Sequence, residues 1–279
     1  MGNPVYLDCN ATTPVDPEVA KTMIPFLGEE FGNPSSAYGY GIRAKRAVED
    51  ARARVAALLR CKPGEVVFTS GGTESNNHAI RGVAWANRHR GNHIITSAIE
   101  HPAVLEVCRH LVQLGFVTTY LPVDSAGLVD PEGVAAAVTE RTILITVMHA
   151  NNEVGTIEPL AEISNIARRL GILFHTDAAQ SAGKIETDVD ALGVDLLSLA
   201  GHKIYAPKGV GALYVREGTA VEKFMHGAGQ ERGFRPGTEN VLGIVGLGKA
   251  CEIARRDLEK NRETMIRSRE RLFSTLSAA

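Results

Sequence analysis

The sequence has few aromatic residues, no excess of either charge, and no apolar segment that approaches the ~18 residues of a membrane span. Aromatic residues make up 5% of the 279 residues, and 30 Lys and Arg residues face 32 Asp and Glu residues, for a formal net charge of -2. This balance excludes a nucleic-acid-binding protein that relies on bulk positive charge. The N-terminus has no basic region followed by an apolar stretch, so we expect no signal peptide. These absences predict a cytoplasmic protein that binds neither nucleic acid nor membrane.

Cysteine is also scarce. The four cysteines, Cys9, Cys61, Cys108 and Cys251, are scattered, with no CxxC pair and no histidine at ligand spacing. Such a distribution argues against a zinc site and against a disulfide framework. We therefore expect no metal, and we interpret the four cysteines as small buried hydrophobic residues.

Glycine, by contrast, is abundant: 28 of the 279 residues, or about 10%, are glycine, against a usual share of ~7%. Runs of β-branched residues alternate with helical stripes, which predicts βαβ units and a mostly parallel, buried sheet. Helices are expected at 43–59 and 76–85, after Pro102, Asp130 and Pro159, and from about 238 onward. The expected strands are 65–69, 93–97, 116–121, 142–148, 172–176, 194–199 and 210–215. Most of the chain is thus predicted to form one α/β domain of roughly seven strands.

Open α/β sheets bind ligands at the carboxyl ends of their strands, so the polar residues that follow each strand are candidates for a site. Gly71-Gly72-Thr73 follows the first strand at a helix start, where free N–H groups and the Thr73 hydroxyl suit a phosphate. The equal alternative is a turn capped by Thr73. No lysine follows at Walker A spacing, and the GxGxxxG run at 227–233 is too long for the dinucleotide fingerprint. NTP and NAD binding therefore have little support.

Four more polar residues follow later strands. His101 is suited to cover a flat ring or to move a proton, although a surface histidine is the simpler interpretation. Asn152 belongs to a polar cluster at 149–155 that alternatively only shapes a turn. Asp177 is expected to be partly buried and to need a compensating charge, unless it caps a helix. Lys203 is either a surface lysine or an amine whose pKa is lowered by desolvation and neighbouring positive charge, which would make it a nucleophile for carbonyls.

Together these features predict one cofactor. A phosphate cradle, a histidine over a ring, a carboxylate for a pyridine nitrogen and a lysine for a Schiff base are what pyridoxal 5'-phosphate (PLP) requires. Asp177 would keep the ring nitrogen protonated, so that the ring accepts electrons when a bond at the substrate Cα breaks. Lys203 would bind the cofactor covalently and then shuttle the Cα proton.

The motifs resemble those of the cysteine desulfurases that supply sulfur for iron–sulfur clusters, within the class V aminotransferase group. The resemblance implies the fold-type-I PLP-dependent transferase large domain, and removal of sulfur from L-cysteine to give alanine and a persulfide. Selenocysteine lyases are similar too, notably at 229–240. The matching segments run nearly end to end: YLDCNATTP at 6–14, GNPSS at 32–36, TSGGTESNN at 69–77, MHANNEVG at 148–155, HTDAAQS at 175–181, GHK at 201–203 and RPGTEN at 235–240.

The resemblance also assigns residues to the cofactor's ring. Lys203 would form the Schiff base, and His101 would stack on the ring and take part in proton transfer. Asp177 would pair with the pyridine nitrogen, while Asn152 and Gln180 would face the phenolic oxygen. Lys203 and His101 are the residues with catalytic roles.

The phosphate would be bound by Gly72, Thr73 and His202. Thr238 would reach the phosphate of the neighbouring subunit, which implies a homodimer with active sites at its interface. Many relatives have serine where this chain has Ala200, so one hydroxyl donor is absent, at a cost of about 1 kcal/mol.

The resemblance implies a PLP-binding large domain at 16–255 and a small domain built from both chain ends. Residues 1–15 would be the N-terminal segment of that small domain, and 256–279 a helix that leads to the rest. The family's sulfur-accepting cysteine and an arginine that holds the substrate carboxylate lie in the C-terminal part of the small domain. No cysteine of this sequence stands at a matching place, so we expect a chain that lacks this part.

The expected function is that of a PLP-dependent cysteine desulfurase, with L-cysteine or selenocysteine as substrate and a sulfur-acceptor scaffold protein as a partner. A selenocysteine lyase or a class V aminotransferase would share every cofactor residue and differ in the substrate. A catalytically silent PLP-binding fragment or dimerisation partner is the alternative from another class, and the missing nucleophile favours it.

Overall fold

Seven strands form one mixed sheet in the computed structural model, which describes residues 5–278. Their order is β1–β7–β6–β5–β4–β2–β3. Strand β7 is antiparallel to both of its neighbours, and the pairs from β6 to β3 are parallel, which confirms the expected mostly parallel sheet. The strands are β1 (Val66–Thr69), β2 (His93–Ser97), β3 (Val117–Leu121), β4 (Thr142–Thr146), β5 (Leu173–Asp177), β6 (Leu196–Ala200) and β7 (Gly211–Val215).

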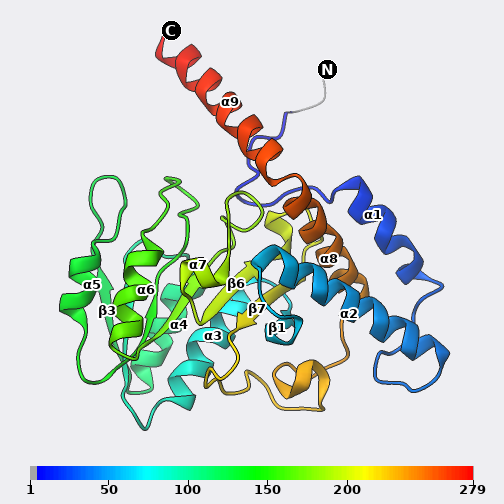
Figure 1. The fold of residues 1–279 in the computed structure, drawn as a ribbon, viewed down its shortest axis with the longest axis horizontal. Helices are drawn as coiled ribbons and strands as arrows, with labels where there is room; N and C mark the ends of the chain where they lie inside the picture. Colours follow the sequence, from blue (N-terminus) through cyan, green and yellow to red (C-terminus); the bar gives the residue numbers. More distant parts are fainter. Residues whose placement is uncertain (1–4, 279) are drawn as a thin grey trace.

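Helices cover both faces of the sheet (Figure 1). One face packs against α3 (Gly72–Ala86) and α4 (Pro102–Gln113). The opposite face packs against a larger group: α1 (Pro17–Met23), α2 (Gly39–Leu59), α5 (Pro131–Ala137), α6 (Leu160–Arg169), α7 (Val189–Leu192) and α8 (Val241–Arg256). The described residues also form four short 3-10 helices: η1 (Ile24–Leu27), η2 (Pro63–Glu65), η3 (Gly201–Lys203) and η4 (Gln230–Gly233).

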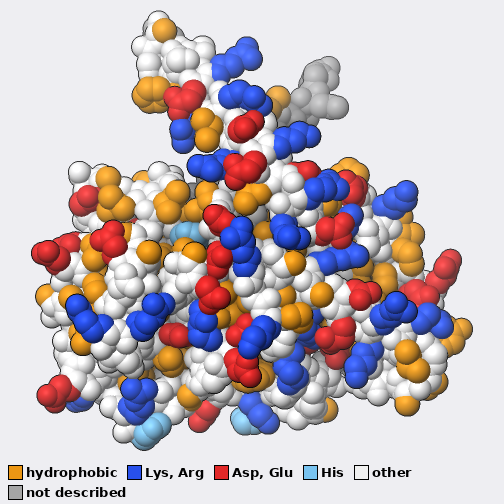
Figure 2. Space-filling view, in the orientation of Figure 1, with side chains coloured by type: hydrophobic (Ala, Val, Ile, Leu, Met, Phe, Trp, Pro, Cys, Tyr) orange, Lys and Arg blue, Asp and Glu red, His pale blue; other side chains and the backbone are white. Residues whose placement is uncertain are grey.

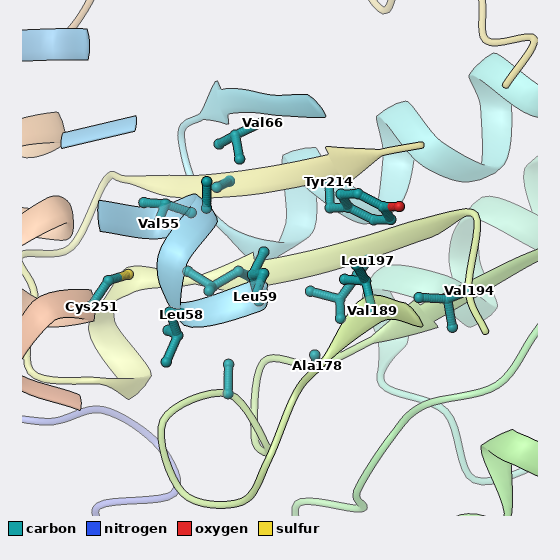
Figure 3. Packing of buried hydrophobic residues seen from close by; sticks show 14 of the residues in the cluster. Val55, Leu58, Leu59, Val66, Ala178, Val189, Val194, Leu197, Tyr214 and Cys251 are labelled. Carbon is teal, nitrogen blue, oxygen red and sulfur yellow. The ribbon is translucent and has the colours of Figure 1, made fainter. Parts of the chain in front are cut away.

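Successive strand residues enter opposite hydrophobic clusters, because side chains alternate across a sheet. Ile94 of β2 belongs to the α3–α4 side and Ile95 to the other. The central strands are buried along their whole length, as expected for a sheet covered on both faces. Figure 3 shows part of the larger cluster, where Leu59 of α2 meets the sheet beside Leu197 and Tyr214.

Local sequence signals explain where several helices begin. Asp130 caps α5 by accepting a hydrogen bond from Glu132 N, and His101 caps α4 by accepting one from Ala103 N. Proline occupies the first turn of both helices, where no backbone donor is lost. The alternative in which Thr73 caps the turn before α3 is wrong, because the N-cap of this helix is Gly71 and no side chain makes a capping hydrogen bond there.

Helix α9 (Leu258–Ser277) projects away from the sheet, with a break from α8 at Asp257 (Figure 1). Residues 1–4 and 279, at the outer ends of the expected small-domain segments 1–15 and 256–279, lie outside the described residues. Basic and acidic side chains are interspersed on the face in Figure 2, in keeping with the balanced net charge. Between residues 5 and 278, no helix has both the length and the apolar character needed to cross a membrane.

Candidate active site

A cavity of about 550 Å³ opens at the carboxyl ends of the parallel strands. Nine residues are predicted from the sequence to hold a cofactor, and eight of them line this cavity. Thr238 lies outside the lining, in the segment between η4 and α8. The eight that line the cavity are Gly72, Thr73, His101, Asn152, Asp177, Gln180, His202 and Lys203.

The start of α3 forms one end of the cavity. Gly71 has a φ of +151°, a conformation that side-chain-bearing residues rarely adopt, and it turns the chain from β1 into the helix. A Cβ on Gly72 would come within 3.2 Å of the Ala200 side chain, so glycine keeps the backbone close to the end of β6. The first N–H groups of a helix have no partner within it and attract anions. This end of the cavity therefore suits a phosphate group.

His202 stands beside this end, in η3. Its Nδ1 lies 3.1 Å from the Thr12 hydroxyl oxygen. Partial burial, together with the charges of Lys203 and Lys208, lowers the pKa of the His202 imidazole. A neutral imidazole has one N–H to donate, which fits a role at a phosphate oxygen.

Asp177 ends β5 at the floor of the cavity and is 5% exposed. Its Oδ1 accepts a hydrogen bond from Ala179 N at 2.9 Å, and its Oδ2 accepts one from Asn76 Nδ2 at 2.6 Å. It caps no helix, which settles one alternative left open by the sequence. Among residues 5–278, no Lys, Arg or His forms an ion pair with it. A buried carboxylate without a cation is the partner that a protonated pyridine nitrogen needs.

Lys203 faces the same cavity from η3. Its Nζ donates hydrogen bonds to the carbonyl oxygens of Asn10 and, at 2.9 Å, of Ala11. Burial lowers the pKa of the Lys203 amine, as expected, while the carboxylates of Asp177 and Asp8 oppose that shift. Positive neighbours are present too, since the charge of Lys203 lowers the pKa of Lys184 and of His202.

Three side chains complete the wall. The Nδ1 of His101 accepts a hydrogen bond from Ala103 N at 3.1 Å, which leaves Nε2 as the ring nitrogen that carries a proton. Gln180 donates through Nε2 to the Asn10 carbonyl at 2.9 Å. Asn10 in turn donates through Nδ2 to the Asn152 carbonyl at 3.1 Å. The N-terminal segment 8–12 thus crosses the cavity and touches four of the selected residues: Asn152, Gln180, His202 and Lys203.

Several lining residues were missed by the sequence analysis. Asp8, Asn10 and Ala11 reach the cavity from the N-terminal segment. No local sequence pattern predicts that this segment contacts residues so distant along the chain. Asn76 follows Gly72 by four residues and Thr73 by three, so helical spacing alone would have placed it on the same face. The helical spacing from Gly72 and Thr73 is thus the sequence signal that could have identified Asn76 as a residue of the site.

Glu100 lies buried behind His101. Its Oε1 accepts hydrogen bonds from the Ser97 hydroxyl and from Met148 N, both at 2.8 Å, which joins the ends of β2 and β4. Burial raises the pKa of the Glu100 carboxyl to about 8. It is therefore a mostly neutral acid at pH 7 that holds two site-bearing strands together.

The cysteines differ in part from the expectation that all four are buried. Cys108 and Cys251 are buried, and burial raises the pKa of the Cys108 thiol to about 12. Cys61 is half-buried, whereas Cys9 is exposed in the segment that crosses the cavity. The interpretation as a buried residue is thus wrong for Cys9, because this segment lies over the sheet edge instead of within the core.

Comparison with known proteins agrees with this geometry. The profile of the aminotransferase class-V family matches residues 5–279. Cysteine desulfurase IscS of Dictyoglomus turgidum is 54% identical over 97% of this chain and 68% of its own length. Cysteine desulfurase IscS of Methanosarcina thermophila is 52% identical over 98% of this chain and 67% of its own. The chain therefore spans about two thirds of the length of these relatives.

Solved structures give the same result. A NifS-like protein superposes with a TM-score of 0.96 at 45% identity, covering 98% of this chain and 76% of that one. A structure described as SspA in complex with cysteine gives a TM-score of 0.87 at 45% identity, over 89% and 72% of the two chains. These matches confirm the fold-type-I architecture of the large domain. The chain belongs to the cysteine desulfurases of the aminotransferase class-V family.

Proposed function

We propose that this cysteine desulfurase binds PLP in the 550 Å³ cavity and uses it to remove sulfur from L-cysteine, giving alanine and a persulfide. The observation that carries the proposal is that one cavity wall holds both the Lys203 amine and the buried Asp177 carboxylate, which has no ion-pair partner among residues 5–278. A carboxylate for a ring nitrogen and an amine for an aldehyde are the two fixed requirements of this cofactor. The family's dependence on PLP supports the same assignment.

The phosphate would lie at the start of α3. Backbone N–H groups of Gly72 and Thr73, the Thr73 hydroxyl and the His202 ring are the donors available there. Ala200 offers no hydroxyl, and we expect the loss to be small because several donors remain. We further propose that Thr238, which lies outside this cavity, meets the phosphate of a second copy in a homodimer.

The residues would divide the chemical work as follows. Bound PLP supplies an electron sink for the bond that breaks at the substrate Cα. Asp177 holds a proton on the ring nitrogen, and His101 covers one face of the ring through its imidazole. Lys203 takes a proton from the substrate Cα and returns one, and its lowered pKa increases the fraction of neutral amine that does so.

Asn152 and Gln180 would orient the cofactor through its phenolic oxygen. Gln180 has Nε2, a donor, on the side of the Asn10 carbonyl, and Lys203 donates to that same carbonyl. Asn10 also donates to the Asn152 carbonyl, so Asn152, Gln180 and Lys203 all lie next to Asn10. They are therefore close enough to act on one small molecule. Lys203 must release the Asn10 and Ala11 carbonyls before its amine can react.

The substrate and the sulfur acceptor follow from the family. SspA, described in complex with cysteine, has a similar fold, which supports L-cysteine as the substrate. We propose that the persulfide forms on a cysteine of the family's C-terminal small domain and passes to a scaffold protein for iron–sulfur cluster assembly. On this proposal residues 16–255 are the PLP domain, and 1–15 and 256–279 belong to the small domain.

The cofactor proposal is tested by titrating the chain with PLP and recording the visible absorbance of bound cofactor. We expect saturable absorbance in the unsubstituted chain and in Lys208→Ala, an exposed control, and its loss in Lys203→Ala. Equal absorbance in Lys203→Ala would contradict the assignment.

The reaction is tested by product analysis. With a cysteine-bearing relative's small domain joined after residue 279, and a dithiol added to reduce the persulfide, we expect alanine and sulfide from L-cysteine. Selenide from L-selenocysteine without sulfide from L-cysteine would instead favour a selenocysteine lyase, and keto-acid formation would favour an aminotransferase.

A further inference from the structure

Asn76 lies one turn into α3 and lines the cavity beside Asp177. Its Nδ2 donates the 2.6 Å hydrogen bond to Asp177 Oδ2, and the residue is 1% exposed. Building on the function proposed above, we propose that Asn76 is a positioning residue. It keeps the Asp177 carboxylate ionised and aimed at the ring nitrogen of the cofactor.

Two donors hold the carboxylate, one on each oxygen. Asn76 Nδ2 meets Oδ2, and Ala179 N meets Oδ1 at 2.9 Å. Each oxygen of a carboxylate accepts more than one hydrogen bond, so both retain room for a further donor. Because the two contacts lie on different oxygens, they fix the rotation of the carboxylate as well as its place. Removing the Asn76 amide would free that rotation.

The surrounding charges show why a neutral donor matters here. Burial raises the pKa of Asp177, while the hydrogen bonds from Ala179 and Asn76 and the charges of His101 and Lys203 lower it. Glu100, also buried nearby, carries the same sign of charge when ionised. The amide of Asn76 does not titrate, and it remains a donor after the Lys203 amine has reacted.

The other end of the Asn76 amide points to a ligand-related role. Its Oδ1 is buried and has no hydrogen-bond partner among the described residues. The reversed amide would place Oδ1 against a carboxylate oxygen, so the ionised Asp177 itself selects this orientation. An unpaired buried acceptor costs free energy, and an apolar residue would avoid that cost. The presence of asparagine at position 76 is therefore better explained by its action on Asp177 than by a gain in folding stability.

The test compares Asn76→Leu, which keeps the side-chain shape, with Asn77→Leu, the matched control. Asn77 is the next residue of α3, and its Nδ2 donates to the Thr73 carbonyl at 3.0 Å. Both variants and the unsubstituted chain are titrated with PLP and with the PLP analogue that has carbon in place of the ring nitrogen. For PLP, we expect a Kd at least about tenfold higher in Asn76→Leu, the loss typical of a hydrogen bond to a charged group.

The carbon analogue separates positioning from a structural role. Asn76→Leu and Asn77→Leu should bind it with the same Kd, since it has no nitrogen for Asp177 to meet. Weaker binding of both ligands by Asn76→Leu, or equal PLP binding by the two variants, would overturn this inference alone. Failure of the unsubstituted chain to bind PLP would overturn the proposed function and this inference together.

A second variant guards against misfolding of Asn76→Leu. In Asn76→Asp the two neighbouring carboxyls would share one proton at low pH, and the protonated one would donate to the other. The ratio of its Kd for PLP to that of the unsubstituted chain should be close to one at pH 6. This ratio should rise by pH 9, where both carboxyls, at positions 76 and 177, are ionised. A ratio that does not change with pH would contradict the inference.

Discussion

Lys184 Nζ donates a hydrogen bond to Gln180 Oε1, four residues earlier in the chain, at 2.7 Å and at the edge of the candidate active site. Because Oε1 accepts from Lys184, the amide of Gln180 must present its Nε2 on the side of Asn10 and the cavity. Burial, and then the charge of Lys203, lower the pKa of the Lys184 amine to about 8. A second amine with lowered pKa therefore stands beside the predicted catalytic lysine.

Lys184→Met should change the pH dependence of folding stability. The amine has a pKa of about 8 in the folded chain against a usual 10.5, so unfolding takes up a proton between these values. Raising the pH from 8 to 10.5 therefore stabilises the unsubstituted chain relative to Lys184→Met. Urea unfolding of both proteins at pH 7.5 and pH 10 measures this difference.

The exposed Lys208→Met is the control for that comparison. It should leave the pH dependence as it is in the unsubstituted chain. A parallel pH dependence in Lys184→Met as well would show that Lys184 is not the group responsible.

Glu100→Gln should remove a loss of stability that the unsubstituted chain shows as the pH rises. The pKa of Glu100 is about 8 in the folded chain and 4.5 in the ordinary carboxyl, so unfolding releases a proton between these values. Higher pH then favours unfolding, up to about pH 8. We expect the two proteins to differ little near pH 5, and Glu100→Gln to be the more stable at pH 8. Chemical denaturation at each pH measures this difference, and the same pH dependence of stability in both proteins would contradict a neutral Glu100. Glu106→Gln, on the exposed face of α4, serves as the control.

Arg52 and Glu231 form a buried ion pair that anchors the segment before Thr238. Arg52 Nη2 lies 2.6 Å from Glu231 Oε1, both side chains are under 5% exposed, and Glu231 Oε2 also accepts from Phe68 N. Glu231→Gln removes the buried counter-charge of Arg52 and leaves it only the half-exposed Glu49, at 3.1 Å from Nε, so we expect a cost of about 3 kcal/mol, at the lower end of the range for a broken buried pair.

The double variant Arg52→Met/Glu231→Gln should cost less than the sum of the two single variants, because no buried charge is left unpaired. Denaturant unfolding of the four proteins measures the coupling. Lys62→Met, at the exposed Lys62–Glu217 pair, should have a much smaller effect. Additive losses at Arg52 and Glu231 would show that the two charges do not depend on each other.

Much of the fold was predictable from local sequence signals. The apolar stripe at 43–59 marked most of α2, and Asp130-Pro131 marked the start of α5, because cap chemistry and helical period act over a few residues. The order of the strands and the reversal of β7 were not predicted. They depend on contacts between distant segments, such as Val66 with Tyr214.

The candidate site was predictable where residues directly follow strands. Asp177 and Lys203 were selected on that ground, and the structure places both on one wall. Asn10 escaped selection because its contacts with Lys203 and Gln180 span 193 and 170 residues along the chain. No pattern within a short window carries that information.

The central claim is that Lys203, and no other lysine, joins the cofactor. The most direct test is to mix the chain with PLP, reduce the product with borohydride, digest it and locate the modified lysine by mass spectrometry. We expect the pyridoxyl phosphate group on Lys203. Modification of Lys184, whose pKa is also lowered, with Lys203 unmodified would contradict the account.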